Sequence, residues 1–165
     1  MPTEKQLDLA FEQALQTDKE FLAWFVSRLK YGASYPKLHW SRSNYAWGKA
    51  KLLLPNSETG ALEAVWCEGE TDVLVVLEGA PEERLGVHVE NKRASGTFTL
   101  FQPEVCAARA EAWIGNGNYE SYQRWETVLL APNSFYKRNT NEARKFTTFI
   151  SHEDVAERLP VFASS

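Results

Sequence analysis

The chain has 165 residues, of which 44% are hydrophobic and 24% are charged, and its formal net charge at pH 7 is −4. This length and composition predict a globular domain that buries its core without disulfides, because its two cysteines, Cys67 and Cys106, lie far apart. The acidic balance argues against a protein that coats nucleic acid through charge alone. No apolar run approaches the roughly 18 residues of a membrane span, and the N-terminus lacks a basic and apolar signal segment. We therefore expect a cytoplasmic protein without a membrane partner.

Two helices are expected at the start of the chain. Residues 4–16 place apolar side chains on one face of a helix, and Thr3 with Gln6 three positions later has the form of a capping box. Thr17 begins a second such pattern, and the segment FLAWFVSRL that follows predicts a second helix. Residues 31–48 are rich in Ser, Tyr and Trp without a hydrophobic period, which predicts a long ordered loop.

Strands follow, because the hydrophobic period changes to two from Lys49 onward. The segments KAKLLLP, ALEAVWC, ETDVLVVLE and RLGVHVENK are apolar or β-branched and are separated by turn residues, which predicts three or four antiparallel strands. A helix is expected over residues 102–114, with Pro103 in its first turn. The last two apolar segments, 126–132 and 145–151, are strand candidates, and a short helix follows them.

This order of elements predicts an α/β fold, in which a mixed β-sheet of four to five strands is flanked by helices. No linker and no low-complexity segment interrupts the chain, so residues 1–165 are expected to form a single domain. The N-terminal helices would occupy residues 1–31.

Two carboxylates and a lysine are expected to meet where two neighbouring strands end. Alternate residues of a strand share a face, so Glu90 and Lys92 project to the same side. A hairpin folded about residues 79–83 pairs positions that are symmetric about residue 81, which places Asp72 opposite residue 90, give or take one residue. The sequence therefore predicts a cluster of Asp72, Glu90 and Lys92.

This trio suits a hard divalent cation. Two carboxylates and a neighbouring main-chain carbonyl leave positions on Mg²⁺ for water and for a phosphate. A lysine beside them can orient or deprotonate that water and offset negative charge in the transition state. The structural alternative is an ordinary cross-strand Glu–Lys pair on a solvated sheet face, since the D…ExK pattern is short and common by chance.

The order of the motifs resembles one known family. GETDVLVVLE, then LGVHVENK, then FQPE at a helix start resemble the PD-(D/E)XK nuclease superfamily, in particular its bacterial branch with an ENK second motif. TVLLAP and FTTFISHEDV resemble the later strands of that branch, so the likeness covers roughly residues 62–158. It implies a restriction-endonuclease-like fold with a catalytic core over residues 49–158.

The resemblance implies a role for each residue of the cluster. Asp72 would be the metal-binding acid of the first motif, Glu90 the second metal ligand and Lys92 the catalytic lysine. The main-chain carbonyl of Asn91 would be the third protein ligand of the metal. Gln102 resembles the glutamine that begins the following helix and supports the site or contacts the nucleic-acid backbone.

Two further features concern the helices around this site. Many members of the family bring a glutamate from the first helix into the site, and Glu12 is the candidate because it lies beside the apolar stripe, whereas Glu20 is explained as a capping-box residue. A plain solvated glutamate is the alternative for Glu12. The chain departs from the family in the helix after Gln102, which lacks the second glutamine and the Arg-Tyr pair of that branch.

A basic window precedes an acidic one. Residues 21–57 carry six positive charges and no acid, and residues 58–83 carry eight negative charges and no base. Four of the positive side chains lie among aromatic residues in a pattern typical of a nucleic-acid groove. They are Lys37, Arg42, Lys49 and Lys51, interleaved with Trp40, Tyr45 and Trp47. We expect this window to border the cleft of the carboxylates, because a protein of net charge −4 needs a positive rim to hold a polyanion. A solvated charged face is the alternative.

The leading hypothesis from the sequence is a Mg²⁺-dependent nuclease, with Mn²⁺ as a substitute, that hydrolyses phosphodiester bonds of DNA by metal-activated water. The alternative is a catalytically silent nuclease-fold protein that acts as a nucleic-acid- or protein-binding module. The sequence contains neither a Walker A loop nor a GxGxxG motif, so no nucleotide cofactor is expected. A homodimer stays open as an assembly.

Overall fold

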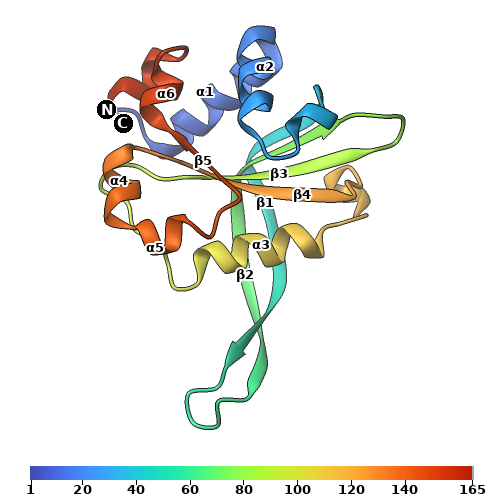
Figure 1. Ribbon diagram of the computed structural model, residues 1–165, viewed down its shortest axis with the longest axis vertical. Helices are drawn as coiled ribbons and strands as arrows, with labels where there is room; N and C mark the ends of the chain where they lie inside the picture. Colours follow the sequence, from blue (N-terminus) through green and yellow to red (C-terminus); the bar gives the residue numbers. More distant parts are fainter. Residues whose placement is uncertain (165) are drawn as a thin grey trace.

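A five-stranded mixed sheet with the strand order β1-β2-β3-β4-β5 forms the centre of the molecule (Figure 1). The computed structural model describes residues 1–164, and within them every side chain except those of residues 45–47. β1, β2 and β3 pair in antiparallel fashion, whereas the β3–β4 and β4–β5 pairs are parallel. The strands are β1 (Lys37–Pro55), β2 (Leu62–Glu78), β3 (Arg84–Asn91), β4 (Arg124–Ala131) and β5 (Thr148–Ser151).

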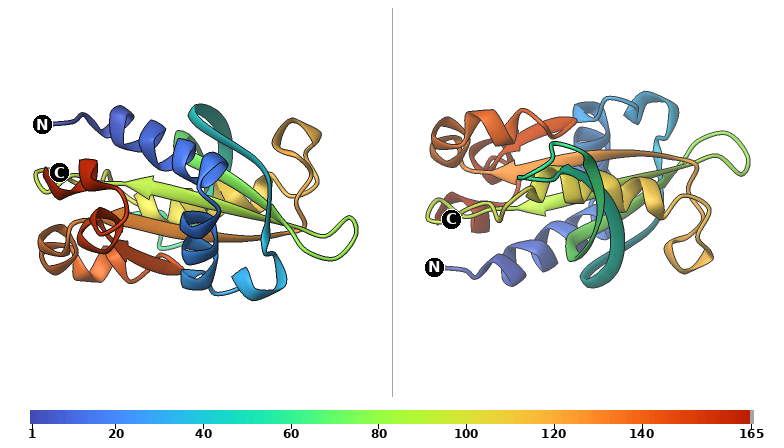
Figure 2. Two further views of the ribbon diagram at one scale, coloured as in Figure 1. Left: turned by 90° about the horizontal axis from the view of Figure 1, so that it is seen from above. Right: turned by 90° about the horizontal axis from the view of Figure 1, so that it is seen from below.

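Helices cover both faces of the sheet, which confirms the predicted α/β architecture. One face packs against α1, α2 and α6, and the other against α3, α4 and α5 (Figure 1). The two chain termini lie at the same end of the molecule (Figure 2). The helices are α1 (Glu4–Thr17), α2 (Lys19–Arg28), α3 (Gln102–Ala112), α4 (Asn133–Arg138), α5 (Thr140–Ala143) and α6 (His152–Ala156). Short 3-10 helices lie at Gly32–Ser34, Gly117–Tyr119 and Pro160–Ser164.

The aromatic side chain of Phe11 lies at the centre of the α1 layer and is fully buried. Its ring meets those of Phe21 and Phe25 edge to face, with centroids 5.4 and 5.3 Å apart. Phe162, near the C-terminus, approaches the same ring at 6.4 Å. Phe11 therefore joins α1, α2 and the end of the chain in one cluster.

The first helix begins as the sequence predicts, and the second does not. The Thr3 hydroxyl accepts a hydrogen bond from the Gln6 N–H, and the Gln6 side chain accepts one from the Thr3 N–H, so the capping box is present. Thr17, expected to begin α2, is instead the last residue of α1. The N-cap of α2 is Asp18, whose carboxylate accepts hydrogen bonds from two backbone N–H groups of the first turn.

The first two strands are much longer than expected. The segment 31–48, expected to be a loop, enters β1 at Lys37, and the two strands expected within 61–78 form the single strand β2. The pairing of β1 with β2 shifts register between Leu38 and Trp40 and again between Ser43 and Ala46. Such bulges add a residue to one strand, so the alternation of side chains breaks and the period of two is hidden in the sequence. Past the body of the molecule, β1 and β2 continue as a two-stranded ribbon (Figure 1).

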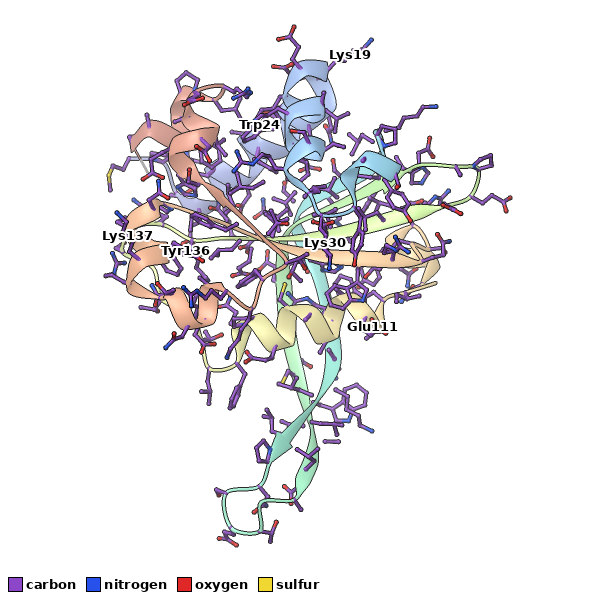
Figure 3. All side chains as sticks on the ribbon, viewed as in Figure 1. Lys19, Trp24, Lys30, Glu111, Tyr136 and Lys137 are labelled. Atoms are coloured by element: carbon purple, nitrogen blue, oxygen red, sulfur yellow. The ribbon has the colours of Figure 1, made fainter. Side chains whose placement is uncertain are left out.

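A buried glutamate in β4 holds the backbone that follows α2. The two carboxylate oxygens of Glu126 accept hydrogen bonds from the N–H groups of Lys30, at 3.2 Å, and Tyr31, at 3.0 Å. Figure 3 shows Lys30 beside β4, whereas Lys19, at the start of α2, points away from the body. Burial raises the pKa of Glu126, and the two backbone hydrogen bonds oppose that rise.

Glu126→Ala is expected to lower the free energy of unfolding by about 2 kcal/mol, because two backbone N–H groups lose their acceptor in a buried place. Urea unfolding followed by circular dichroism measures this loss. Glu157→Ala is the control, because the Glu157 side chain is 74% exposed and a surface substitution changes stability by no more than about 0.5 kcal/mol. Equal stability of the two variants would contradict a structural role for Glu126.

Candidate functional site

The β2–β3 register brings the two predicted carboxylates together. Val73 pairs with Val89 and Leu74 with His88, so the next position along places Asp72 opposite Glu90, as the count about residue 81 predicts. Directly opposite residues of an antiparallel pair point to the same face of the sheet. That face is covered by the start of α3.

Asp72 and Glu90 line a cleft of about 460 Å³ between the sheet and α3. One wall is the part of β2 that leads into the ribbon, and the opposite wall is the N-terminal part of α3 with the segment before it. The lining residues are Cys67, Glu68, Gly69, Glu70, Asp72, Glu90, Lys92, Thr99, Leu100, Gln102, Val105 and Arg109. We call this space the Asp72 cleft.

Each of the two carboxylates is held through one oxygen. The Asn91 N–H donates to Asp72 Oδ2 at 2.7 Å. Glu90 Oε1 forms an ion pair with Lys92 Nζ at 2.9 Å and accepts a hydrogen bond from the Gln102 side chain. Within the described residues no hydrogen-bond donor contacts Asp72 Oδ1 or Glu90 Oε2. One oxygen of each carboxylate thus stays available for another ligand.

Burial sets the charge of this cluster. It raises the pKa of both carboxyls, and the repulsion from Glu90 raises the pKa of Asp72 further. Burial also lowers the pKa of Lys92, but the attraction of Glu90 and Asp72 exceeds that effect, so the pKa of Lys92 rises overall. Lys92 is therefore an ammonium ion. Positive charge close to the two carboxyls favours their ionised form.

These residues fit a divalent cation that prefers oxygen. Two buried carboxylates with a free oxygen each, close to the main-chain carbonyl of Asn91, suit Mg²⁺ or Mn²⁺ together with water. In the described part of the chain, His, Cys, Asp and Glu side chains form no group of three or more that could hold a metal ion. A cation here would thus depend on the two carboxylates, a backbone carbonyl and water.

The first helix brings Asp8 toward this cluster. Asp8 Oδ1 accepts a hydrogen bond from Asn91 Nδ2 at 2.7 Å, and Asn91 Oδ1 lies 2.9 Å from His152 Nε2. Burial raises the pKa of Asp8 to about 7. The side chain of Asn91 thus joins α1 to α6, while its backbone N–H holds Asp72. The sequence offers a signal for Asp8, because this acid comes directly after Leu7 of the apolar stripe and lies one helical turn before Glu12.

Glu12, the acid predicted from that helix, does not line the Asp72 cleft. Its carboxylate accepts hydrogen bonds from the Ser41 hydroxyl at 3.1 Å and from the Ser43 N–H at 2.9 Å, and from the Ser43 hydroxyl as well. These serines lie in β1 beside its second register shift. Glu12 therefore fastens α1 to the first strand, a role that the sequence did not reveal because the segment was expected to be a loop.

The four predicted basic residues are not gathered at the cleft either, and none of them lines it. Lys37 and Lys51 lie near the two ends of β1, roughly 45 Å apart along the strand at about 3.3 Å of rise per residue. Lys49 forms an exposed ion pair with Glu68 at 3.1 Å, and Lys51 lies over the ring of Trp66. The window is thus an extended strand rather than a compact loop, and Lys49 approaches the cleft through Glu68, which lines it. Binding of nucleic acid by Lys37, Arg42, Lys49 or Lys51 stays a prediction, and the side chains of Tyr45 and Trp47 lie outside the described residues.

Arg109, to which the sequence analysis assigns no role, lines the Asp72 cleft. Its Nε donates to the Thr71 hydroxyl at 3.0 Å, and its Nη2 donates to the Glu70 carbonyl at 2.9 Å. Thr71 also contacts His88 Nδ1 at 3.0 Å. Burial, helped by the charge of Arg109, lowers the pKa of His88, so this histidine is neutral.

Comparisons of the chain with protein-family models, with curated proteins and with solved structures return no match. The resemblance to the PD-(D/E)XK nucleases thus stays a prediction from the motifs. Across residues 1–164, none of the helices has the length and apolar character needed to cross a membrane.

Proposed function

We propose that this protein is a Mg²⁺-dependent nuclease that hydrolyses phosphodiester bonds of DNA. The observation that carries the proposal is the meeting of Asp72, Glu90 and Lys92, from two paired strands, in one cleft. Both carboxylates keep an oxygen free in a place where burial makes negative charge unfavourable, which is the condition under which a divalent cation binds well.

Each residue has a separate task in this proposal. Asp72, Glu90 and the carbonyl of Asn91 hold the cation, and Gln102 fixes the Glu90 carboxylate by its hydrogen bond. A bound Mg²⁺ or Mn²⁺ ion supplies Lewis acidity, which polarises a phosphoryl oxygen and lowers the pKa of a bound water. The Lys92 ammonium lies 2.9 Å from Glu90 Oε1. It orients the attacking water and offsets the negative charge that develops on the phosphate oxygens in the transition state.

The second candidate function is a nucleic-acid- or protein-binding module that keeps the site without turnover. The acidity of the cleft favours the protein-binding form of this candidate, because Glu68 and Glu70 line the cleft together with the two candidate ligands. Four carboxylates repel a polyanion unless a cation is bound.

Two measurements on purified protein test the nuclease proposal. Labelled single- and double-stranded DNA and RNA are incubated with Mg²⁺, with Mn²⁺ or with EDTA, and metal binding is measured by calorimetry. We expect metal-dependent cleavage of DNA by the wild type.

Asp72→Asn and Glu90→Gln are expected to abolish metal binding, because a site with so few protein ligands cannot lose one, and to reduce cleavage by at least about a hundredfold. Glu157→Gln, an exposed glutamate outside the cleft, is the control and should retain both properties. A folded wild type that binds neither ion at millimolar concentration would refute the nuclease, and binding of nucleic acid without cleavage would favour the module.

A further inference from the structure

Arg109 in α3 is a buried cation whose direct partners are neutral. Its exposed fraction is 3%, and its two hydrogen bonds go to a hydroxyl and a carbonyl. Within the described residues no carboxylate lies within ion-pair distance of its guanidinium. Buried charges are ordinarily paired with an opposite charge. The charge of Arg109 acts on Glu90 and lowers the pKa of that carboxyl, but no anion of the described residues contacts the guanidinium directly.

A chain of hydrogen bonds fixes the position of this side chain. The Tyr122 hydroxyl donates to the Ala110 carbonyl at 2.5 Å, so it accepts from His88 Nε2 at 3.0 Å. The other ring nitrogen of the neutral His88 is then an acceptor, and the Thr71 hydroxyl donates to it. The oxygen of Thr71 is left to accept from Arg109 Nε. These hydrogen bonds run from the carbonyl of Ala110 to the side chain of Arg109, and the two residues are consecutive in α3. They therefore hold the guanidinium without any carboxylate.

The remaining nitrogen of Arg109 is directed to the Asp72 cleft. Nε and Nη2 are used by Thr71 and Glu70, and no acceptor contacts Nη1 among the described residues. A side chain at Gly69, which also lines the cleft, would overlap Nη1. The absence of a side chain at Gly69 thus leaves the room that Nη1 occupies.

We propose that Arg109 binds a phosphate group of the nucleic-acid strand in the Asp72 cleft, an inference that rests on the proposed function of that cleft. A guanidinium suits a phosphate because its planar donors match two phosphate oxygens and its charge is permanent. Among the described side chains, Lys92 is the only other cation that lines the cleft, and it is engaged by Glu90. Arg109 is therefore the cation in this cleft that is available to a phosphate.

The salt dependence of DNA binding separates a phosphate contact from a purely structural role. Binding of a short labelled single-stranded DNA with a cleavage-resistant phosphorothioate backbone is measured by fluorescence anisotropy at several salt concentrations and constant Mg²⁺, so that the cation offsets the cleft carboxylates and cleavage does not contribute. We expect Arg109→Gln to weaken binding about tenfold and to lower the slope of log K against log salt by about 0.7, the value for one lost phosphate contact on a single strand. Arg109→Lys keeps the charge and should keep the slope while losing part of the affinity.

Two further variants complete the design. Arg124→Gln is the matched control, because Arg124 is an exposed arginine that contacts the ring of Tyr31 outside the cleft, and its slope should equal that of the wild type. Gly69→Ala displaces Nη1 without changing any charge, and it should weaken binding even if Arg109→Gln does not fold.

Several outcomes would overturn the inference. If Arg109→Gln and Arg109→Lys lose stability alike and both keep the wild-type slope, Arg109 only fastens α3 to β2. If Arg109→Gln loses binding of inorganic phosphate but not the slope for DNA, the ligand is free phosphate. If the wild type does not bind the DNA in Mg²⁺, there is no contact to lose. Failure of Mg²⁺-dependent cleavage together with the expected change of slope would instead refute the nuclease and leave the phosphate contact in place.

Discussion

Replacing Lys92 by methionine is expected to lower the rate of DNA cleavage by about a hundredfold or more, with metal binding unchanged or slightly tighter. The methionine keeps most of the length of the side chain but removes the ammonium ion that lies 2.9 Å from Glu90 Oε1. Removing that charge frees the Glu90 carboxylate for a cation, whereas the reaction loses the group that orients water and offsets developing charge.

Calorimetry with Mg²⁺ and single-turnover cleavage of labelled DNA measure the two effects separately. Lys19→Met is the control, because Lys19 is an exposed lysine that points away from the body of the molecule (Figure 3), and surface substitutions of this kind change stability little. Loss of metal binding in Lys92→Met would mean that the lysine organises the ligands. A cleavage rate equal to that of the wild type would exclude Lys92 from the reaction.

Phe11→Ala is expected to lower the free energy of unfolding by about 3–5 kcal/mol. The Phe11 ring is fully buried and meets Phe21, Phe25 and Phe162, so its removal opens a cavity that joins α1, α2 and the chain end. Because α1 also carries Asp8, which contacts Asn91, the variant should lose metal affinity at temperatures where its folded fraction falls.

Urea unfolding at constant temperature tests this expectation. Leu9→Ala on the same helix is the control, since Leu9 is 46% exposed and its truncation should cost no more than about 0.5 kcal/mol. Phe11→Leu should fall between the two variants. A loss below about 1.5 kcal/mol in Phe11→Ala would show that α1 contributes little to the core.

The part of the site that the sequence predicts depends on local geometry. The positions of Asp72 and Glu90 follow from one hairpin and the period of two in a strand, and the register agrees with that count. The capping box of Thr3 is equally local, since it spans a single turn. Such features need no knowledge of how distant elements pack.

The rest depends on tertiary contacts that a pattern cannot supply. The first part of β1, residues 37–48, is expected to be a loop because two register shifts hide the alternation, and only its pairing with β2 makes it a strand. The first-helix acid near the site is Asp8 rather than Glu12, a difference of one helical turn that is decided by where β1 and Asn91 lie. The short helices α4 and α5 have too few residues for a visible period.

The ribbon of β1 and β2 connects a remote part of the surface to the two carboxylates. Gly48 and Gly69 pair where the ribbon leaves the body, and Trp113 and Arg109 of the α3 region occupy the space that side chains at these glycines would need. The base of the ribbon is thus clamped by α3, and backbone pairing continues from there to Pro55 and Leu62. Leu62 lies roughly 30 Å along β2 from Asp72, at about 3.3 Å per residue. The strand that carries the Asp72 carboxylate thus also reaches the end of the ribbon, and α3 holds that strand between the two points.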